Sequence, residues 1–148
     1  ELTMIPISDG DKGLTHEMQS SPERLKADAL SREIIGAAIE VHRHLGPGLF
    51  ESVYEECLCC ELGLRGISFR RQVPLPLSYK GLNLDCGYRL DILVEDLVIV
   101  ELKAVEEINF LHEAQLLTYL KLRNTWLGLL INFNVRMLRD GITRLVNG

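Results

Sequence analysis

The chain has 148 residues, which is enough for one domain with a buried core of its own. Hydrophobic residues make up 47% and charged residues 25% of the composition, as in ordinary globular proteins. The formal net charge of −5 argues against indiscriminate binding of nucleic acids. No apolar run approaches the roughly 20 residues of a membrane span, and the N-terminus lacks the apolar core of a signal peptide. We therefore expect a soluble, cytoplasmic protein without a membrane partner.

The N-terminal part of the chain divides into a polar tail and a first helix. Residues 1–22 contain Gly and Ser without hydrophobic periodicity, which predicts a flexible tail ahead of a single domain over residues 23–148. Asp28 or Ser31 can cap a helix that runs to about Leu45, where Gly-Pro-Gly ends it.

The remaining elements alternate between helix and strand. They are a helix over about Leu49–Leu62, strands over Ile67–Tyr79, Asn83–Val94 and Leu97–Lys103, a helix over Glu106–Leu122, a strand over Trp126–Phe133, and a short strand or hairpin within Val135–Val146. Pro74 and Pro76 limit the first strand to a sheet edge or to two short pieces. The order ααβββαβ predicts an α/β fold with a mixed central sheet flanked by helices. The helical crossover makes the last long strand parallel to Leu97–Lys103.

The stretch from Arg89 to Lys103 contains two apolar runs around a polar Glu-Asp pair, the pattern of a β-hairpin with a tight turn. With the turn centred on Asp96, Asp91 faces Glu101 directly, and Lys103 shares the face of Glu101. Like charges opposite one another destabilise a sheet, and a divalent cation between them would remove the conflict. The hairpin is therefore expected to bind a metal ion. The pattern taken alone is equally compatible with a solvated strand end.

The residues around this pair suit a hydrolytic site. Asp91, Glu101 and the backbone carbonyl of Leu102 offer the hard oxygen ligands that Mg²⁺ or Mn²⁺ prefers. Lys103 can orient or deprotonate an attacking water, or stabilise charge on a phosphate. This set of residues predicts hydrolysis of a phosphodiester.

These residues resemble a known family. An acid on an early helix, then D…E-x-K on a hairpin, then a helix and a strand, is similar to the pattern of the PD-(D/E)xK nuclease superfamily, which implies a restriction-endonuclease-like core. The run VHRHLGPGLFESVY (41–54) resembles a narrower family named for its GxxExxY motif. The resemblance extends over about residues 30–147 through ELKAV (101–105), AQLLTYL (114–120) and GLLINF (128–133). One difference is Glu55, since the family often has Gln after the motif tyrosine.

The resemblance implies a role for each matching residue. Asp91 and Glu101 would bind metal, Lys103 would be the catalytic lysine, and Glu51 would complete the metal shell or hold a second ion. On the residues alone, Glu51 is also a carboxylate that favours a helix N-terminus. Gln115 and Tyr119, four apart on one helix face, resemble the Q-x-x-x-Y element of the RecB-type branch, which supports the site and substrate. Amphipathic packing is the alternative for this pair.

Three further residues are candidates for support or substrate binding. Tyr54 lies one turn after Glu51, and His42 lies on the apolar side of the first helix within the motif. Both can support the site, although their positions favour a core tyrosine and a hydrogen-bonded structural histidine. Arg89 is expected to face Lys103 and contact phosphate, with a solvated strand residue as the alternative.

The four cysteines offer another metal hypothesis. Cys57 and Cys60 form a CxxC motif, and Cys59 and Cys86 could supply further ligands to zinc or an iron–sulfur cluster. The chain lacks a second CxxC or a nearby His, which favours reduced cysteines that pack as small hydrophobes.

The leading functional hypothesis is a Mg²⁺- or Mn²⁺-dependent nuclease whose substrate is DNA rather than RNA. The alternative is a non-catalytic nucleic-acid-binding or complex-assembly module that keeps the nuclease fold. Small size and acidic charge favour this alternative, and the intact acid–acid–lysine set argues against it. By analogy, a homodimer would enlarge the surface that binds a long substrate.

Overall fold

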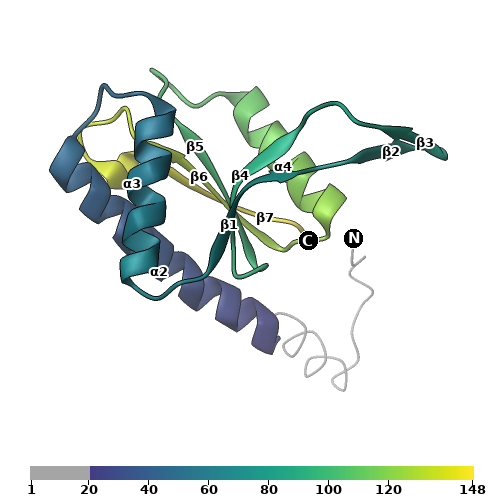
Figure 1. Ribbon diagram of the computed structural model, residues 1–148, viewed down its shortest axis with the longest axis horizontal. Helices are drawn as coiled ribbons and strands as arrows, with labels where there is room; N and C mark the ends of the chain where they lie inside the picture. The colour runs from purple at the N-terminus through teal and green to yellow at the C-terminus, as the bar shows by residue number, and fades with distance from the viewer. Residues whose placement is uncertain (1–20) are drawn as a thin grey trace, which may run out of the picture.

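The computed structural model describes residues 21–148 (Figure 1). Most of the expected tail, residues 1–22, lies outside this described part. The first helix, α2 (Pro22–Leu45), begins earlier than Asp28 or Ser31. Ser21 caps it by accepting a hydrogen bond from the Arg24 amide, and a proline suits the first helical position because its φ angle is already helical.

The second helix, α3 (Glu51–Leu64), follows a short loop in which Gly46 takes a φ of +67°. Tyr54, Leu58 and Leu62 recur every four residues on its buried face, as an amphipathic helix requires. Helices α2 and α3 pack against each other and against the same face of the sheet (Figure 1). The helix begins two residues later than predicted, so Glu51 is its first residue.

The central sheet has five strands in the order β1-β4-β5-β6-β7. Their bounds are β1 Phe69–Pro74, β4 Arg89–Val94, β5 Val98–Lys103, β6 Leu127–Asn132 and β7 Ile142–Val146. Strands β5 and β6 are parallel and are connected by α4 (Phe110–Arg123), whereas the other neighbours are antiparallel. This arrangement confirms the expected mixed sheet flanked by helices and is consistent with a restriction-endonuclease-like core.

A second, two-stranded sheet forms from β2 (Leu77–Tyr79) and β3 (Leu82–Leu84). This hairpin projects away from the body of the molecule (Figure 1). The strand expected over Asn83–Val94 is therefore interrupted at residues 85–88, where Gly87 has a φ of +73° and the chain turns back into the central sheet. At the C-terminal end, a 3₁₀ turn over Leu138–Gly141 leads into β7 in place of the hairpin that the sequence allowed.

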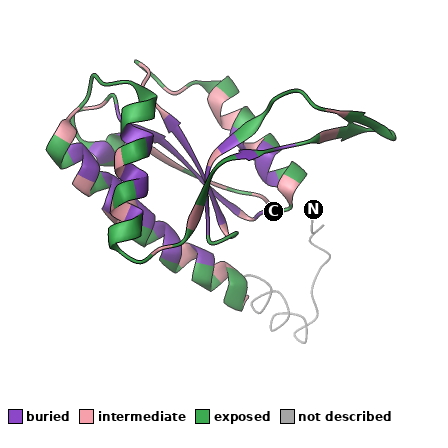
Figure 2. Ribbon diagram, viewed as in Figure 1, coloured by how far each residue is buried: buried purple, intermediate pink, exposed green. Residues whose placement is uncertain are grey.

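The strand β5 lies in the middle of the sheet and is covered on both faces (Figure 2). Val98, Val100 and Leu102 pack into the core beneath α2 and α3. Ile99 packs into a second core beneath α4. Burying one such side chain contributes about 1.5–3 kcal/mol, so both helical layers hold β5 in place.

The β4–β5 hairpin has the predicted register. Its pairs are Ile92↔Val100, Leu93↔Ile99 and Val94↔Val98. The turn residues Glu95 and Asp96 both have positive φ, +49° and +55°, a backbone that matches the twist of tight hairpins. Within residues 21–148, none of the helices is both long and apolar enough to cross a membrane.

Candidate functional site

The acid pair at the open end of the β4–β5 hairpin forms the centre of the site. The regular ladder ends at Ile92↔Val100. Beyond it, the Asp91 amide donates to Glu101 Oε1 at 3.1 Å, and the Leu102 amide donates to Asp91 Oδ2 at 2.9 Å. Each carboxylate therefore binds the backbone of the opposite strand, as the predicted register required.

Burial puts this pair under electrostatic stress. The side chain of Glu101 lies inside the sheet, and burial followed by the negative charge of Asp91 raises the pKa of Glu101 to about 9. Burial also raises the pKa of Asp91. At neutral pH without a cation, Glu101 therefore keeps its proton. A divalent cation would stabilise both carboxylates in their charged form.

The lysine and the third acid approach this pair along β5. Lys103 is half-buried and lies two residues after Glu101 on β5, on the same face of the strand. Its positive charge partly offsets the rise in the pKa of Asp91 and of Glu101. Glu51, the first residue of α3, accepts a hydrogen bond from the amide of Ala104 at 3.3 Å. Within residues 21–148, however, no three His, Cys, Asp or Glu side chains lie together as a metal-binding group.

The helix α4 brings a phenol to the same place. Tyr119 is buried, and burial raises its pKa to about 12, with the nearby charges of Glu101, Tyr88 and Asp91 adding to the effect. Gln115 lies one turn earlier on α4 with its side chain exposed. Of the predicted pair, Tyr119 is therefore buried near the acids, whereas the side-chain amide of Gln115 lies at the surface.

Comparison with known proteins fits this geometry. Residues 28–145 match the PD-(D/E)XK nuclease superfamily. The chain belongs to this superfamily. The matched range contains all the site residues that the sequence predicted. A search of curated proteins and a search of solved structures each found no match.

Two predicted supporting residues of this superfamily domain are structural. The Tyr54 hydroxyl donates to the Gly46 carbonyl at 2.6 Å and accepts from the Leu49 amide at 3.2 Å. Its ring stacks on Phe133 with centroids 4.4 Å apart. His42 Nε2 lies 2.8 Å from the Val135 carbonyl. Tyr54 therefore fixes the loop that leads to Glu51, and both residues support the site indirectly.

Arg89 lies near the site but outside the β4–β5 ladder. It pairs with Pro74 of β1, and its guanidinium donates to the Gln72 carbonyl at 3.4 Å. The register therefore does not include the expected pair between Arg89 and Lys103. The side chain is exposed, and its contact with phosphate stays a prediction.

Sequence reasoning missed two groups of polar residues that shape the site. Asn132 ends the apolar strand β6, and its buried amide holds the loop after β5 by exchanging hydrogen bonds of 3.1 and 2.9 Å with the backbone of Val105. A single Asn at the end of the run GLLIN was its only signal. The other group consists of Glu55, Arg71 and Gln72, which are far apart in the sequence and meet only in the fold.

The cysteines lie apart from the acid pair. All four are free thiols, with Cys59 buried and Cys60 and Cys86 exposed. Burial raises the pKa of Cys59 to about 11, which keeps it protonated. The described residues contain no metal-binding group at these cysteines, so the structure gives no support to a zinc or iron–sulfur centre among residues 21–148.

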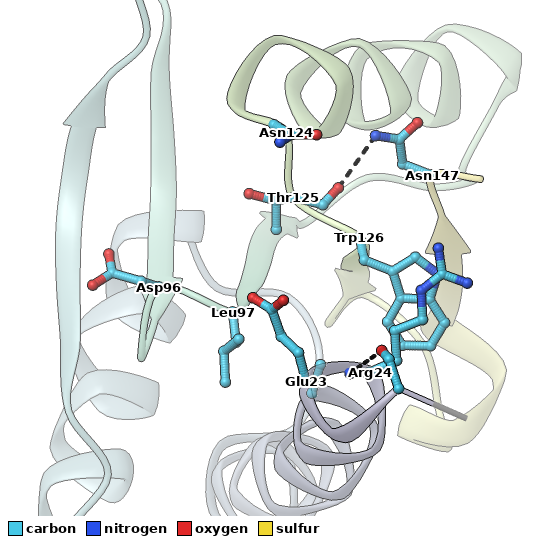
Figure 3. A pocket seen from close by; sticks show the side chains of 10 residues that line it. Glu23, Arg24, Asp96, Leu97, Asn124, Thr125, Trp126 and Asn147 are labelled. Atoms are coloured by element: carbon cyan, nitrogen blue, oxygen red, sulfur yellow. Dashed lines mark hydrogen bonds between the residues drawn. The ribbon is translucent and has the colours of Figure 1, made fainter. Parts of the chain in front are cut away.

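A separate cavity of about 250 Å³ lies at the opposite end of the hairpin (Figure 3). Its lining includes Arg24, Asp96 and Trp126, with the Arg24 guanidinium 5.1 Å from the centroid of the Trp126 ring. It shares none of its lining residues with the acid pair. The chemistry of the superfamily therefore does not require this cavity.

Proposed function

We propose that this chain is a Mg²⁺- or Mn²⁺-dependent nuclease that hydrolyses phosphodiester bonds of DNA in preference to RNA. Membership of the PD-(D/E)XK nuclease superfamily supports a metal-dependent nuclease. The resemblances to the GxxExxY family and the RecB-type branch belong to the proposal. The observation that carries it is the Asp91–Glu101 pair, a half-buried and a buried carboxylate that each bind the backbone of the opposite strand.

The donor set fits a hard divalent cation. Asp91, Glu101, the carbonyl of Leu102 and Glu51 would hold it, because all four offer oxygen ligands. Such an ion would compensate the like charges of Asp91 and Glu101. When bound, the ion supplies Lewis-acid activation of the phosphate and lowers the pKa of water.

The chain's own side chains would handle protons and orientation. The ammonium group of Lys103 can donate to a phosphate oxygen and hold the attacking water in line with the scissile bond. Tyr119 keeps its proton at neutral pH, because its pKa is raised to about 12, and can donate a hydrogen bond within the site. At the surface, Gln115 and Arg89 are available to contact the strand that carries the phosphate.

A cleavage panel tests the proposal. Purified full-length protein is incubated with Mg²⁺ or Mn²⁺ and single-stranded, duplex or branched DNA, and with RNA of matching sequence. We expect cleavage of DNA by the wild type and loss of cleavage in Lys103→Ala. Lys121→Ala is the control, since it removes an exposed lysine of α4. Absence of cleavage of every substrate, or full activity of Lys103→Ala, contradicts the proposal.

A non-catalytic nucleic-acid-binding module is the second candidate. It is favoured by the lack of a preformed group of three metal-binding side chains within residues 21–148. Calorimetric titration with Mn²⁺ distinguishes the two functions. Binding in the micromolar to millimolar range that is lost in Asp91→Asn favours the nuclease, whereas no binding at millimolar Mn²⁺ favours the module.

A further inference from the structure

The helix α3 directs two glutamates toward the sheet, one turn apart. Glu51 reaches the end of β5 through the amide of Ala104, and Glu55 reaches β1 through Arg71 and Gln72. The strand β4 lies between β1 and β5 in the sheet. The two helix acids therefore contact the strands on either side of Asp91.

An irregular position in β1 places one of the partners of Glu55 opposite Asp91. Arg71 pairs with Ile92 and Val73 pairs with Leu90, so Gln72 lies opposite Asp91 without pairing with it. Gln72 has a φ of +50°, which costs a residue other than glycine on the order of 1–3 kcal/mol. In a regular strand, consecutive side chains point to opposite faces. Here the positive φ of Gln72 interrupts this alternation, and Arg71 and Gln72 bind the same carboxylate.

The contacts of Glu55 use both of its oxygens. Oε2 accepts from the Arg71 guanidinium at 2.7 and 3.2 Å, and Oε1 accepts from the side-chain amide of Gln72 at 2.7 Å. The residue is 9% exposed, so its charge is only weakly screened by solvent. Its partner Gln72 lies opposite Asp91 on the neighbouring strand, so this charge lies beside the strand that carries Asp91. The guanidinium of Arg71 offsets it, and also binds the exposed Glu56 at 2.9 Å.

We propose that the Arg71–Glu55 ion pair, anchored by Gln72, sets the charge beside Asp91 and thereby the affinity of the candidate centre for its divalent cation. These are positioning residues, and the inference rests on the proposed function. The intact pair contributes no net charge. Removal of Glu55 leaves the positive charge of Arg71 beside the centre and weakens cation binding. Removal of Arg71 leaves the negative charge of Glu55 and strengthens it.

Calorimetric titration of the metal-free, full-length protein with Mn²⁺ at pH 8 tests this inference. Glu55→Gln is expected to weaken binding and Arg71→Gln to tighten it, each by roughly tenfold or more. Coulomb's law gives roughly 10²-fold for a unit charge about 10 Å from a divalent ion at an effective dielectric constant near 20, and screening by salt reduces this factor. The double variant should return to within about twofold of the wild type. Arg71→Lys keeps the charge and should bind Mn²⁺ as the wild type does.

The control variant is Glu56→Gln, which removes an exposed carboxylate from the same guanidinium and should leave Mn²⁺ affinity within about twofold of the wild type. A purely structural role of the pair would make Glu55→Gln and Arg71→Gln change affinity in the same direction. That outcome, or an unchanged affinity of Glu55→Gln, overturns the inference alone. A wild type that binds no Mn²⁺ at millimolar concentration overturns the proposed function as well.

Discussion

The two ends of the β4–β5 hairpin carry acids in opposite electrostatic situations. At the turn, Asp96 is exposed and pairs with Arg70 and, at 3.7 Å, with Arg123. At the open end, Asp91 and Glu101 are largely buried and face each other, and the pKa of each is raised. Water and arginine compensate the charge of Asp96, whereas at the open end Glu101 keeps its proton at neutral pH because its charge would be buried beside Asp91. If the chain binds a divalent cation as we propose, the open end is where the ion would relieve the repulsion between these two carboxylates.

The comparison predicts very different outcomes for the same substitution at the two ends. Asp91→Asn is expected to lower the rate of DNA cleavage roughly 10³-fold, because one charged ligand of the candidate centre is lost. Asp96→Asn should leave the rate within about twofold of the wild type. Initial rates with Mn²⁺ measure both effects, and equal losses in the two variants would contradict the comparison.

The buried conflict also predicts an unusual dependence of stability on pH. The pKa of Glu101 is about 9 in the folded state, above its ordinary value of 4.5, so the folded state binds more protons between these values. The free energy of unfolding should therefore fall as pH rises through this range, by at most about 1.4 kcal/mol per unit. Glu101→Gln removes this contribution, so its stability relative to the wild type should increase by on the order of 5 kcal/mol from pH 5 to pH 9.

Urea denaturation at pH 5, 7 and 9 with a chelator present measures this effect. Exposed Glu106→Gln provides the matched control, because it lies in the loop after β5 and leaves the acid pair intact. If the free energy of unfolding changes with pH in the same way for wild type and Glu101→Gln, the pKa of Glu101 is not raised in the folded state.

The loop that leads to Glu51 depends on a buried hydroxyl. Tyr54→Phe keeps the stacking on Phe133 and leaves the Gly46 carbonyl and Leu49 amide without their partner. We expect the free energy of unfolding to fall by about 1–3 kcal/mol. Tyr79→Phe, on the projecting hairpin, should change it by less than about 0.5 kcal/mol because Tyr79 is exposed. Equal effects in urea denaturation would show that the loop does not depend on the Tyr54 hydroxyl.

The smallest effect is expected at the turn. Arg70→Gln breaks an ion pair in which both side chains are more than half exposed, and exposed pairs contribute about 0–1 kcal/mol. Its effect on the free energy of unfolding should shrink further in 1 M salt. A loss above about 2 kcal/mol in the free energy of unfolding would mean that the exposed ion pair at the turn is as important to stability as the acid pair at the open end.

The sequence predicted the hairpin well because its signals are local. Two apolar runs around a short polar turn determine the register of the three pairs that form, Ile92↔Val100 to Val94↔Val98. Beyond them, Asp91 and Glu101 are linked by hydrogen bonds between side chain and backbone. The sequence was also compatible with purely structural roles for Tyr54 and His42, and the hydrogen bonds of both side chains favour those roles. The start of α2 was missed although Ser21 and Pro22 are ordinary start signals, because the polar residues around them resemble a tail.

The left-handed backbone at Gln72 and the contacts of its side chain could not be predicted from the sequence. Arg71 and Gln72 meet Glu55 across 16 and 17 residues of sequence, through the packing of α3 on the sheet. A positive φ at a glutamine has no local sequence signal, since glycine and asparagine are the residues that favour this conformation. The break at residues 85–88 was missed because apolar residues on both sides resemble one continuous strand.

The central place of β5 has a consequence for local unfolding. Segments with many buried apolar contacts open last, and their amides exchange slowest with solvent. Glu101 and Lys103 belong to this most protected strand, whereas Glu51 stands at the exposed start of a surface helix. When α3 frays, Glu51 leaves while the β4–β5 pair stays assembled. If the chain binds a cation as we propose, binding would begin at the hairpin and Glu51 would join afterwards, which would appear as slower amide exchange at the start of α3 in the presence of Mn²⁺.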